Sequence, residues 1–343
     1  MEIAFFDTKP YDIKHFEKYG KENGINFKFF EAKLNKDTVS LAKDCRGVCV
    51  FVNDTVDKTV IAALYGMGIK ILALRCSGYN NVDIKHAFKK IHVVRVPDYS
   101  PYAVAEHTKA LLLTQVRKTH KAYIRTRDFN FSLNGMTGFD LHNKTVGVVG
   151  TGKIGRVFID ICRGFKMNVI AYDKFPKTES DIKYVDLDIL FKESDIISFH
   201  CPLTEETRHI INYESLKKLK DGVILINTSR GALIDTEALI EGIRSKKIGG
   251  ACLDVYEEES DIFFEDFSES VINDDTLLKL ISMPNVIVTS HQAFLTNEAL
   301  ENIAQVTVSN LKTYFENDVC NNELCYRCGK CEECSSVRNE KCF

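Results

Sequence analysis

Short apolar runs that alternate with helical stretches are the feature of this chain that most restricts its fold. Four runs lie in the first third, at residues 2–7, 47–52, 69–76 and 92–97. Six more follow, at residues 145–150, 168–173, 195–200, 222–229, 249–254 and 286–290. Runs of this length between helices are typical of a parallel sheet with helices on its faces. The sequence therefore predicts an α/β fold of two similar lobes, with the second inserted into the first.

The break between Pro97 and Pro101 separates the two series of runs. A long helical pattern follows over residues 101–127, with apolar positions three and four apart. The last helical pattern, at residues 296–317, can return the chain to the first lobe. We expect the first lobe to begin with residues 1–100, the inserted lobe to span 101–295, and the return helix to span 296–324. A cysteine-rich tail occupies 325–343.

Charge and composition exclude several classes of protein. The 343 residues carry 45 Lys and Arg against 48 Asp and Glu, and 45% are hydrophobic. This composition is that of a globular protein, and the near-neutral balance offers no broad basic field for a nucleic acid. No run approaches the roughly 18 apolar residues of a membrane span, and the first residues lack the core of a signal peptide. We expect a cytoplasmic protein without nucleic-acid or membrane partners.

Gly150, Gly152 and Gly155 form a GxGxxG motif between an apolar run and a helical segment. The first glycine allows a tight turn, the second lets the backbone approach a pyrophosphate, and the third lets the helix pack on the strand. The next run ends at Asp173, whose carboxylate can accept from both ribose hydroxyls and would repel a 2′-phosphate. The motif therefore predicts NAD rather than NADP, although the neighbouring Lys174 weakens this preference. The alternative is a glycine-rich turn without a ligand.

Arg230, Glu259 and His291 each lie just beyond the carboxyl end of an apolar run, where open α/β sheets place their ligand crevice. Arginine can grip a carboxylate with two hydrogen bonds, and histidine can exchange a proton with a carbonyl oxygen. A neighbouring carboxylate would orient the imidazole. Singly, each residue could be an ordinary surface or loop residue. Together, downstream of a dinucleotide site, they predict reduction of a 2-oxo acid by hydride transfer.

The sequence also resembles the D-isomer-specific 2-hydroxyacid dehydrogenases from about residue 1 to residue 324, and among them the fermentative D-lactate dehydrogenases. The segments that carry the resemblance are LRCSGYNNVD, RVPDYSPYAVAEHT, RTRDFNFSLNGMTGFD, GTGKIG, HCPLT, INTSRGALID, LDVYEEE and SHQAFLTNEAL. The resemblance implies two Rossmann-like lobes, one flavodoxin-like and one NAD-binding, and NAD-dependent reduction of pyruvate to D-lactate. It also implies a homodimer or homotetramer joined through the cofactor lobes, for which the broad apolar face of the helix from Pro101 is a candidate.

The resemblance implies roles for individual residues. The catalytic positions of the family fall on Arg230, on Glu259 rather than Glu257, and on His291. Besides Arg230, the substrate-side positions are Ser77, Gly78, Tyr99 and Phe294. Besides the three glycines, the cofactor positions are Lys153, Ile154, Asp173, Cys201, Pro202, Thr207, Thr228, Ser229 and Asp254. Of these, Asp254 is expected to accept a hydrogen bond from the nicotinamide carboxamide, and Cys201 with Pro202 to form an apolar wall on the adenine side.

Alternatives remain at this point. Tyr79, Tyr99 and Phe294 would crowd the pocket and favour a small substrate such as pyruvate. An extra methylene typically changes discrimination by only about 1–3 kcal/mol, so a longer 2-oxo acid is the runner-up. Less favoured are an NADH-sensing binding protein and an electron-transfer protein that uses the tail cysteines.

The twelve cysteines fall into two groups. Six are scattered through apolar runs and are expected to be small buried side chains in a reducing compartment: Cys45, Cys49, Cys76, Cys162, Cys201 and Cys252. The other six lie in the last 24 residues. Within that tail, the spacing of Cys325, Cys328, Cys331 and Cys334 suggests an iron–sulfur cluster or a zinc ion. It lacks the three-residue last gap and the following proline of bacterial ferredoxins, and two residues between the cysteine pairs are few for a single tetrahedral zinc. A tail without a metal, or one that senses redox state, is the alternative, and no metal is expected in the catalytic site.

Overall fold

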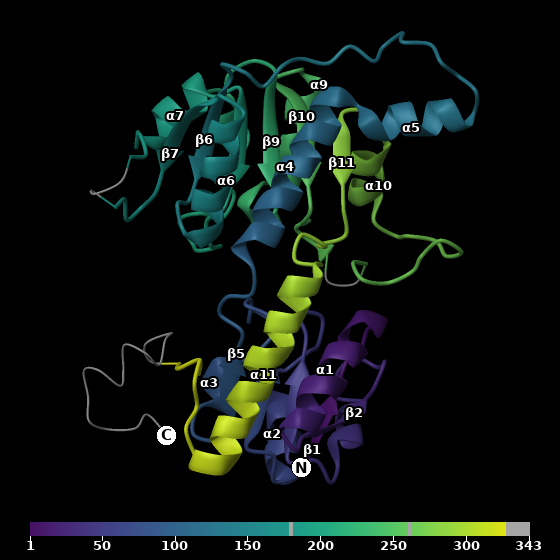
Figure 1. Ribbon diagram of the computed structural model, residues 1–343, viewed down its shortest axis with the longest axis vertical. Coiled ribbons are helices and arrows are strands. Elements are labelled where there is room, and N and C mark those ends of the chain that lie inside the picture. The colour runs from purple at the N-terminus through teal and green to yellow at the C-terminus, as the bar shows by residue number, and fades with distance from the viewer. Residues whose placement is uncertain (178–180, 260–261, 327–343) are drawn as a thin grey trace. The chain divides into compact units, whose positions relative to one another are not determined.

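The structure is a computed structural model that describes residues 1–177, 181–259 and 262–326. The chain divides into two units (Figure 1). Unit 1 comprises Met1–Ser100 together with the chain from Leu295 onward, and unit 2 comprises Pro101–Phe294. The inserted unit thus ends one residue before the expected position.

Unit 1 is a five-stranded parallel sheet with helices on its faces. Its strands are β1 (Glu2–Phe5), β2 (Asn26–Phe29), β3 (Gly47–Val50), β4 (Ile71–Leu74) and β5 (His92–Arg95), in the order β2-β1-β3-β4-β5. This is the flavodoxin-like strand order. Its helices are α1 (Pro10–Glu22), α2 (Lys58–Gly66), α3 (Ile84–Ala87) and the late α11 (Asn297–Asn317), with a 3-10 turn η1 (Val39–Ala42). Because α11 packs against α1 and reaches β4 and β5, the end of the chain completes the first unit.

Strand β2 was not predicted from the sequence. It lies at the edge of the sheet and pairs only with β1 among the described strands. An edge strand is covered on fewer sides, so its sequence, NFKF, alternates instead of forming a continuous apolar run. The interior strands β3 and β4, by contrast, are buried at every residue and are predicted correctly.

Unit 2 is a six-stranded parallel sheet. Its strands are β6 (Thr145–Val149), β7 (Asn168–Tyr172), β8 (Ile196–Phe199), β9 (Val223–Asn227), β10 (Ile248–Leu253) and β11 (Val286–Val288), in the order β11-β10-β9-β8-β6-β7. The helices are α4 (Pro101–Arg117), α5 (Thr119–Arg127), α6 (Lys153–Gly164), α7 (Leu187–Glu193), α8 (Tyr213–Leu216), α9 (Thr236–Arg244) and α10 (Asp275–Ser282), with a 3-10 turn η2 (Gly231–Leu233). All six strands agree with the apolar runs, and the predicted α/β class with two parallel sheets is confirmed.

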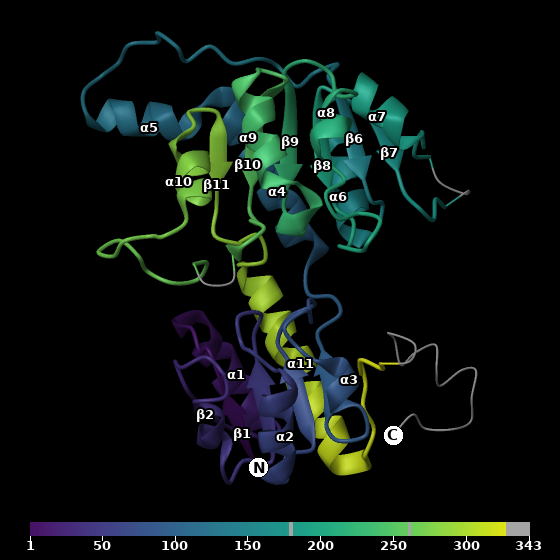
Figure 2. The same cartoon turned by 180° about the vertical axis from the view of Figure 1, so that it is seen from behind.

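Two apolar clusters fill the two faces of the unit 2 sheet. Helices α4 and α6 cover one face, seen in Figure 1, where Leu112 and Phe158 are fully buried. Helices α7, α8, α9 and α10 contribute to the other cluster, and Figure 2 shows α8 and α9 on that side. Since both faces are covered, the strands are mainly apolar, and most of their polar side chains lie near the strand ends.

The long helix expected over residues 101–127 is two helices. The break falls at Lys118, which has a positive φ of 52° and separates α4 from α5. No proline or glycine marks this break in the sequence, and the helical spacing of apolar residues continues across it, so the sequence predicted a single helix. Leu111, Leu112 and Val116 of α4 are buried within unit 2, whereas Tyr102 on the same helix is exposed, and the expected contact between subunits stays a prediction.

The remaining expectations concern thiols and membranes. The six body cysteines are buried and form no disulfide with one another, as predicted. Among the residues that the structure describes, none of the helices combines the length and the apolar character needed to cross a bilayer.

Candidate active site

The glycine motif forms the turn between β6 and α6. Gly150 has a positive φ of 94°, and a Cβ there would lie 2.6 Å from the carbonyl of His200. A Cβ on Gly155 would lie 2.1 Å from the carbonyl oxygen of Gly150. Both positions therefore require glycine for the turn and for the packing of the helix on the strand. By contrast, a Cβ on Gly152 would meet nothing within 4 Å among the described residues. This opening at the start of α6 is where a pyrophosphate could approach the backbone.

The first turn of α6 is suited to an anion. It begins at Lys153 and Ile154, and the N-cap residue is Gly152, which has no side chain to cap the helix. The first N–H groups of a helix lack partners within the helix, and the helix dipole is positive at this end. The turn can therefore bind phosphate oxygens through its backbone.

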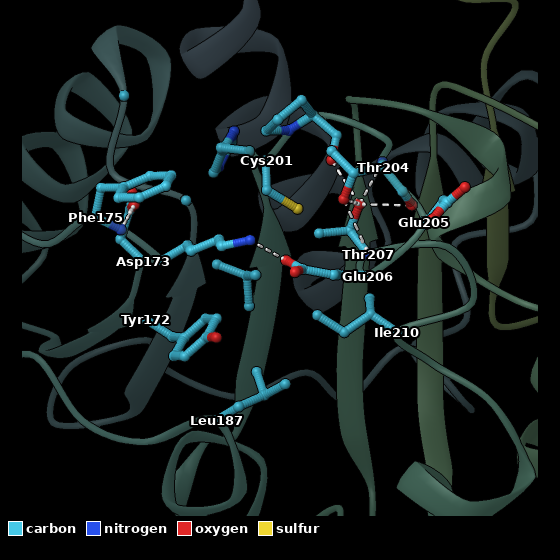
Figure 3. A pocket seen from close by; sticks show the side chains of 16 residues that line it. Tyr172, Asp173, Phe175, Leu187, Cys201, Thr204, Glu205, Glu206, Thr207 and Ile210 are labelled. Carbon is cyan, nitrogen blue, oxygen red and sulfur yellow. Dashed lines mark hydrogen bonds and ion pairs between the residues drawn. The ribbon is translucent and has the colours of Figure 1, made fainter.

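A cavity of about 660 Å³ lies at the carboxyl ends of β6, β7 and β8. The strand order reverses between β6 and β8, and open α/β sheets bind ligands at such a switch point. The lining is mainly apolar, and Figure 3 shows the side chains that surround it. They come from Val149, Gly150, Gly152, Tyr172, Asp173, Lys174, Phe175, Leu187, His200, Cys201, Pro202, Thr204, Glu205, Glu206, Thr207 and Ile210.

Asp173 is placed one residue beyond β7, at the edge of this cavity. Its Oδ2 accepts hydrogen bonds from the backbone N–H of Thr151 (2.6 Å) and from the Thr151 hydroxyl (2.9 Å), while Oδ1 accepts from the N–H of Phe175 (2.9 Å). Burial opposes ionisation of this carboxyl, but the hydrogen bonds outweigh it and lower the pKa of Asp173. The carboxylate is thus charged and fixed to the glycine turn, as an acceptor for ribose hydroxyls requires.

The segment after β8 forms the opposite wall of the cavity. Cys201 is buried, and burial raises the pKa of its thiol to about 11, so it is an apolar wall and not a thiolate. The hydroxyl of Thr207 donates to the carbonyl of Pro202 (2.7 Å), which closes the following turn. Lys174 and Glu206 form an ion pair across the cavity (Figure 3). Sequence reasoning did not identify this pair, because its two residues are on different segments.

Arg230 follows β9 in a turn with several fixed hydrogen bonds. The side chain of Asn227 donates to the carbonyl of Arg230 (2.8 Å). The Ser229 hydroxyl donates to the carbonyl of Cys201 (2.8 Å), which joins the end of β9 to the segment after β8. The Thr228 and Thr108 hydroxyls lie 2.8 Å apart and link the same turn to α4. The half-buried guanidinium of Arg230 is therefore carried on a rigid strand end.

His291 and Glu259 form a hydrogen-bonded pair at the ends of β11 and β10. Nδ1 of His291 lies 2.8 Å from Oε1 of Glu259, and both side chains are about one-fifth exposed (21% and 22%). The other carboxylate oxygen accepts from the N–H of Tyr256 (3.0 Å), which fixes the acid. With Nδ1 committed to Glu259, Nε2 is the ring nitrogen able to exchange a proton with a substrate. Glu257 points elsewhere, since its Oε1 contacts Arg208 (3.0 Å) and His209 (2.7 Å).

Asp254 lies at the turn that carries His291. Its side chain is fully buried, and its oxygens accept from the Thr289 hydroxyl (2.5 Å) and from the N–H groups of Gln292 (3.0 Å) and Ala293 (2.9 Å). Its backbone carbonyl also accepts from the N–H of His291 (2.7 Å). These hydrogen bonds hold the turn that carries His291, which itself has a positive φ of 53°, and the expected bond of Asp254 to the nicotinamide carboxamide stays a prediction.

Two residues around this turn were missed by sequence reasoning. Nε2 of His107 lies 3.2 Å from the Thr289 hydroxyl and 3.3 Å from Asp254 Oδ1. Burial opposes ionisation of Asp254, but hydrogen bonds from His107 and Thr289 lower its pKa nonetheless. The ring of Phe264 lies 5.9 Å from that of His291 and 6.5 Å from that of Phe294, which is itself buried. His107 lies in AEHT, one of the segments that carry the family resemblance, so the sequence did offer a signal for it. Its role was missed because its partners, Thr289 and Asp254, are distant in the sequence.

The expected substrate-side residues other than Arg230 and Phe294 belong to unit 1. Ser77 and Gly78 follow β4 in a loop in which the Ser77 hydroxyl donates to the carbonyl of Pro97 (3.2 Å) and the Ser77 carbonyl accepts from Arg95 (2.8 Å). Tyr99 is half-buried in the segment after β5. Of the predicted tail ligands, Cys325 is buried, whereas Cys328, Cys331 and Cys334 lie outside the described residues.

Comparison with known proteins agrees with this arrangement. Residues 109–293 match the model of the D-isomer specific 2-hydroxyacid dehydrogenase, NAD binding domain. The chain is 50% identical to a 2-hydroxyacid dehydrogenase homolog of Haemophilus influenzae over 326 residues, 94% of this chain and 98% of that protein. It belongs to the D-isomer specific 2-hydroxyacid dehydrogenases. As a member of this family it is an NAD-dependent enzyme, and the predicted cofactor is confirmed.

Two further comparisons involve proteins of Escherichia coli. The chain is 47% identical to the D-lactate dehydrogenase of strain K12 over 328 residues, covering 94% of this chain and 100% of that one. The solved apo-structure of D-lactate dehydrogenase from Escherichia coli superimposes with a TM-score of 0.87 at 45% identity, again covering 94% and 100% of the two chains. The dehydrogenase fold is therefore shared over nearly the whole length.

Proposed function

We propose that this dehydrogenase reduces pyruvate to D-lactate with NADH, in a reversible reaction. The observation that carries the proposal is the His291–Glu259 pair, which presents an oriented imidazole at the end of β11. Arg230 stands at the end of β9, and β10 pairs with both β9 and β11, so all three residues follow the carboxyl ends of adjacent strands. The 47% identity to a D-lactate dehydrogenase supports the choice of substrate.

The protein residues have distinct roles in this proposal. Arg230 binds the substrate carboxylate with its planar guanidinium and polarises the neighbouring carbonyl. His291 donates the Nε2 proton to the carbonyl oxygen during reduction and takes it back during oxidation. Glu259 holds the imidazole in the orientation and tautomer that this transfer needs. NADH, when bound, supplies the hydride.

The cofactor residues present in unit 2 fit a dinucleotide. We assign the pyrophosphate to the start of α6 at Gly152, Lys153 and Ile154, and the adenosine ribose to Asp173. We assign the adenine side to Cys201, Pro202 and Thr207, which line the cavity. Thr228 and Ser229 would lie near the nicotinamide ribose, because they connect β9 to Arg230. Asp254 would lie at the nicotinamide end, where it holds the His291 turn and where a hydrogen bond to the carboxamide stays a prediction.

For the substrate side, we propose that the backbone amides of Ser77 and Gly78 hold the carboxylate together with Arg230. Tyr79, Tyr99 and Phe294 would then limit the space for the substrate side chain. The methyl group of pyruvate fits this restriction, although one more methylene changes discrimination by only about 1–3 kcal/mol. Activity on the neighbouring 2-oxo acids should be lower but measurable.

The test is NADH oxidation at 340 nm with pyruvate and with a series of longer 2-oxo acids, followed by chiral analysis of the product. The proposal predicts the highest kcat/KM with pyruvate, and D-lactate as the product. A higher kcat/KM with a longer 2-oxo acid would refute the substrate but keep the mechanism. NADH binding without turnover of any 2-oxo acid would refute the proposal in favour of an NADH-sensing protein.

We also propose a homodimer or homotetramer. Helix α5 has no buried residue, and the chain after it exposes the large apolar side chains of Phe129, Phe131 and Leu133. Exposed apolar side chains in this number are typical of an interface. The contact is therefore expected within the helical stretch from Pro101, chiefly at α5 and the loop that follows it, and light scattering would measure the assembly. A cytoplasmic location is proposed because the six body cysteines are buried and form no disulfide with one another.

A further inference from the structure

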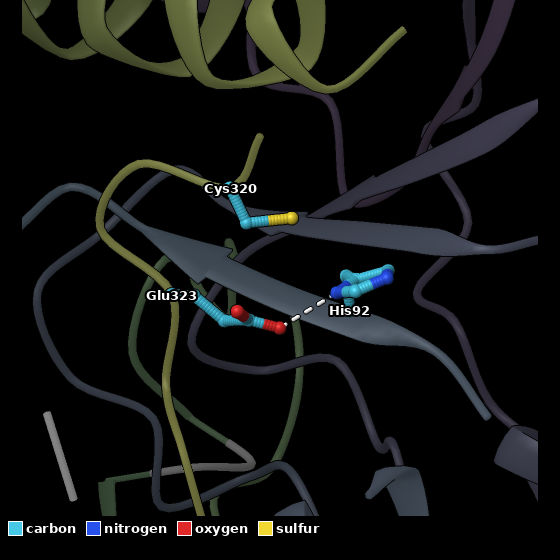
Figure 4. Close-up of side chains that lie close together, drawn as sticks. All are labelled: His92, Cys320 and Glu323. Atoms are coloured by element: carbon cyan, nitrogen blue, oxygen red, sulfur yellow. Dashed lines mark hydrogen bonds and ion pairs between the residues drawn. The ribbon is translucent and has the colours of Figure 1, made fainter. Parts of the chain in front are cut away.

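We propose that unit 1 carries a site for a divalent metal ion of the zinc type, formed by His92, Cys320 and Glu323. One ligand atom from each residue lies within 4.8 Å of the other two. Nδ1 of His92 is 2.7 Å from Oε1 of Glu323. Figure 4 shows the Cys320 sulfur and the Glu323 carboxylate directed toward the imidazole of His92.

The backbone brings these residues together, although more than 200 residues separate His92 from Cys320 in the sequence. Helix α11 ends at Asn317, and Asp318 then adopts a left-handed conformation that turns the chain. The following segment runs antiparallel to β5, with a bridge between Val94 and Glu323. The N–H of Leu324 donates to Val93 (2.7 Å), and the N–H of Arg95 donates to Asn322 (3.1 Å). Because these hydrogen bonds lie on both sides of Glu323, the cluster is built on ordered backbone.

The donor set is the one that Zn²⁺ prefers. Zinc binds cysteine sulfur, histidine nitrogen and carboxylate oxygen, usually with four ligands in a tetrahedron. Tetrahedral zinc bonds of ordinary length place such ligand atoms about 3.3–3.6 Å apart. The cluster spans separations from 2.7 Å to at most 4.8 Å, so small side-chain rotations can surround an ion. A water molecule would complete the tetrahedron.

The charge and burial of the cluster also favour a cation. A thiolate and a carboxylate would together balance the two charges of Zn²⁺, with a neutral imidazole as the third ligand. The side chains of His92 and Glu323 are only 19% and 10% exposed. The centroid of the His92 ring lies 5.1 Å from that of Tyr314, whose pKa is raised by burial and by the nearby Cys320 and Asp318.

The site is separate from the dehydrogenase site. None of its three residues belongs to unit 2, and none is among the residues proposed to bind substrate. Bound metal would connect β5 to the segment that leads into the cysteine-rich tail. Its expected effect is to fix this segment to unit 1, without a direct role in hydride transfer.

The test must separate this site from the tail cysteines. We would use the full-length chain in which Cys328, Cys331, Cys334 and Cys342 are replaced by Ser, and titrate it with Co²⁺ and then Zn²⁺. Cobalt reports thiolate coordination by a charge-transfer band in the near ultraviolet and tetrahedral geometry by visible bands. Zinc affinity follows from competition with a chromophoric chelator.

The proposal predicts saturation at one equivalent of metal per chain. In the same background, Cys320→Ser should abolish the charge-transfer band and weaken Zn²⁺ binding at least about tenfold, since the thiolate is lost. His92→Ala should weaken binding similarly. Cys45→Ser is the matched control, because Cys45 is a buried thiol of unit 1 outside the cluster, and it should leave binding unchanged. NADH oxidation, unchanged in all variants, would show that they fold.

Two results would overturn the proposal. One is the absence of saturable binding in the chain in which Cys328, Cys331, Cys334 and Cys342 are replaced. The other is binding that survives Cys320→Ser and His92→Ala with unchanged affinity, since it would place the metal on other residues. Neither result would bear on the dehydrogenase reaction, which rests on unit 2 residues and is measured separately by NADH oxidation.

Discussion

Replacing Glu259 by Gln removes the charge that accepts the hydrogen bond from His291 and nearly preserves the shape of the side chain. The bond is 2.8 Å long, and each side chain is about one-fifth exposed. A hydrogen bond to a charged group contributes about 1.5–3 kcal/mol, and partial exposure favours the lower half of this range. Because 1.36 kcal/mol corresponds to a factor of ten in rate, kcat/KM for pyruvate should fall about 10- to 50-fold.

The assay is steady-state NADH oxidation at 340 nm, with Glu257→Gln as the matched control. Glu257 is two residues away and pairs with Arg208 and His209 instead, so its substitution should change kcat/KM less than about threefold. A double-mutant cycle then tests whether Glu259 acts through His291. Glu259→Gln should have almost no further effect in a His291→Asn background, because the partner is already gone. Equal losses for Glu257→Gln and Glu259→Gln, or an undiminished loss in the His291→Asn background, would refute the reasoning.

Three further predictions concern the surroundings of the site. Asp173→Ala removes a hydrogen-bond acceptor that Thr151 holds in place, so the Kd for NADH should rise about tenfold or more. The ratio of the Kd for NADPH to the Kd for NADH should decrease, and both constants follow from the fluorescence of the bound cofactors. An unchanged Kd for NADH would show that Asp173 is not in the cofactor site. Burial lowers the pKa of His200 to about 3, so its neutral form stabilises the fold above pH 6.5. That contribution is lost by about 1.4 kcal/mol per pH unit as the pH falls below 6.5, and urea unfolding of His200→Gln should show a smaller loss between pH 6.5 and 5 than the parent. Asp254→Asn should lower kcat more than tenfold while the Kd for NADH stays within about threefold, since a misplacement of about 1 Å at His291 is costly; a parallel loss of NADH affinity would instead indicate direct contact with the nicotinamide.

Much of the fold could be predicted because the strands are short and fully covered. β6, β8 and β9 are apolar at nearly every position, and each begins or ends in a polar turn. Edge strand β2 was missed for the opposite reason, since its exposed side tolerates Asn26 and Lys28. The break at Lys118 was missed because this single residue, in a left-handed conformation, separates α4 from α5, and no glycine or proline marks the position in the sequence.

The candidate site was predictable where a residue lies within a few positions of the carboxyl end of a strand. Arg230, Glu259 and His291 could be named because the carboxyl ends of parallel strands meet at one edge of the sheet. Asp254 follows the same rule, yet its side chain turns into the protein and binds the His291 turn, which only three-dimensional packing decides. His107 and the cluster of His92, Cys320 and Glu323 were missed because their partners are far apart along the chain.

The measurement that tests the central claim most directly is the rate of His291→Asn with pyruvate, together with its affinity for NADH. Asparagine tolerates the positive φ of 53° at this position but cannot donate the proton. Proton transfer by a positioned side chain typically contributes about 10²–10⁴-fold, so kcat/KM should fall by that factor while the Kd for NADH stays nearly constant. A decrease of less than about threefold, with NADH binding intact, would contradict the assignment of His291 as the proton donor.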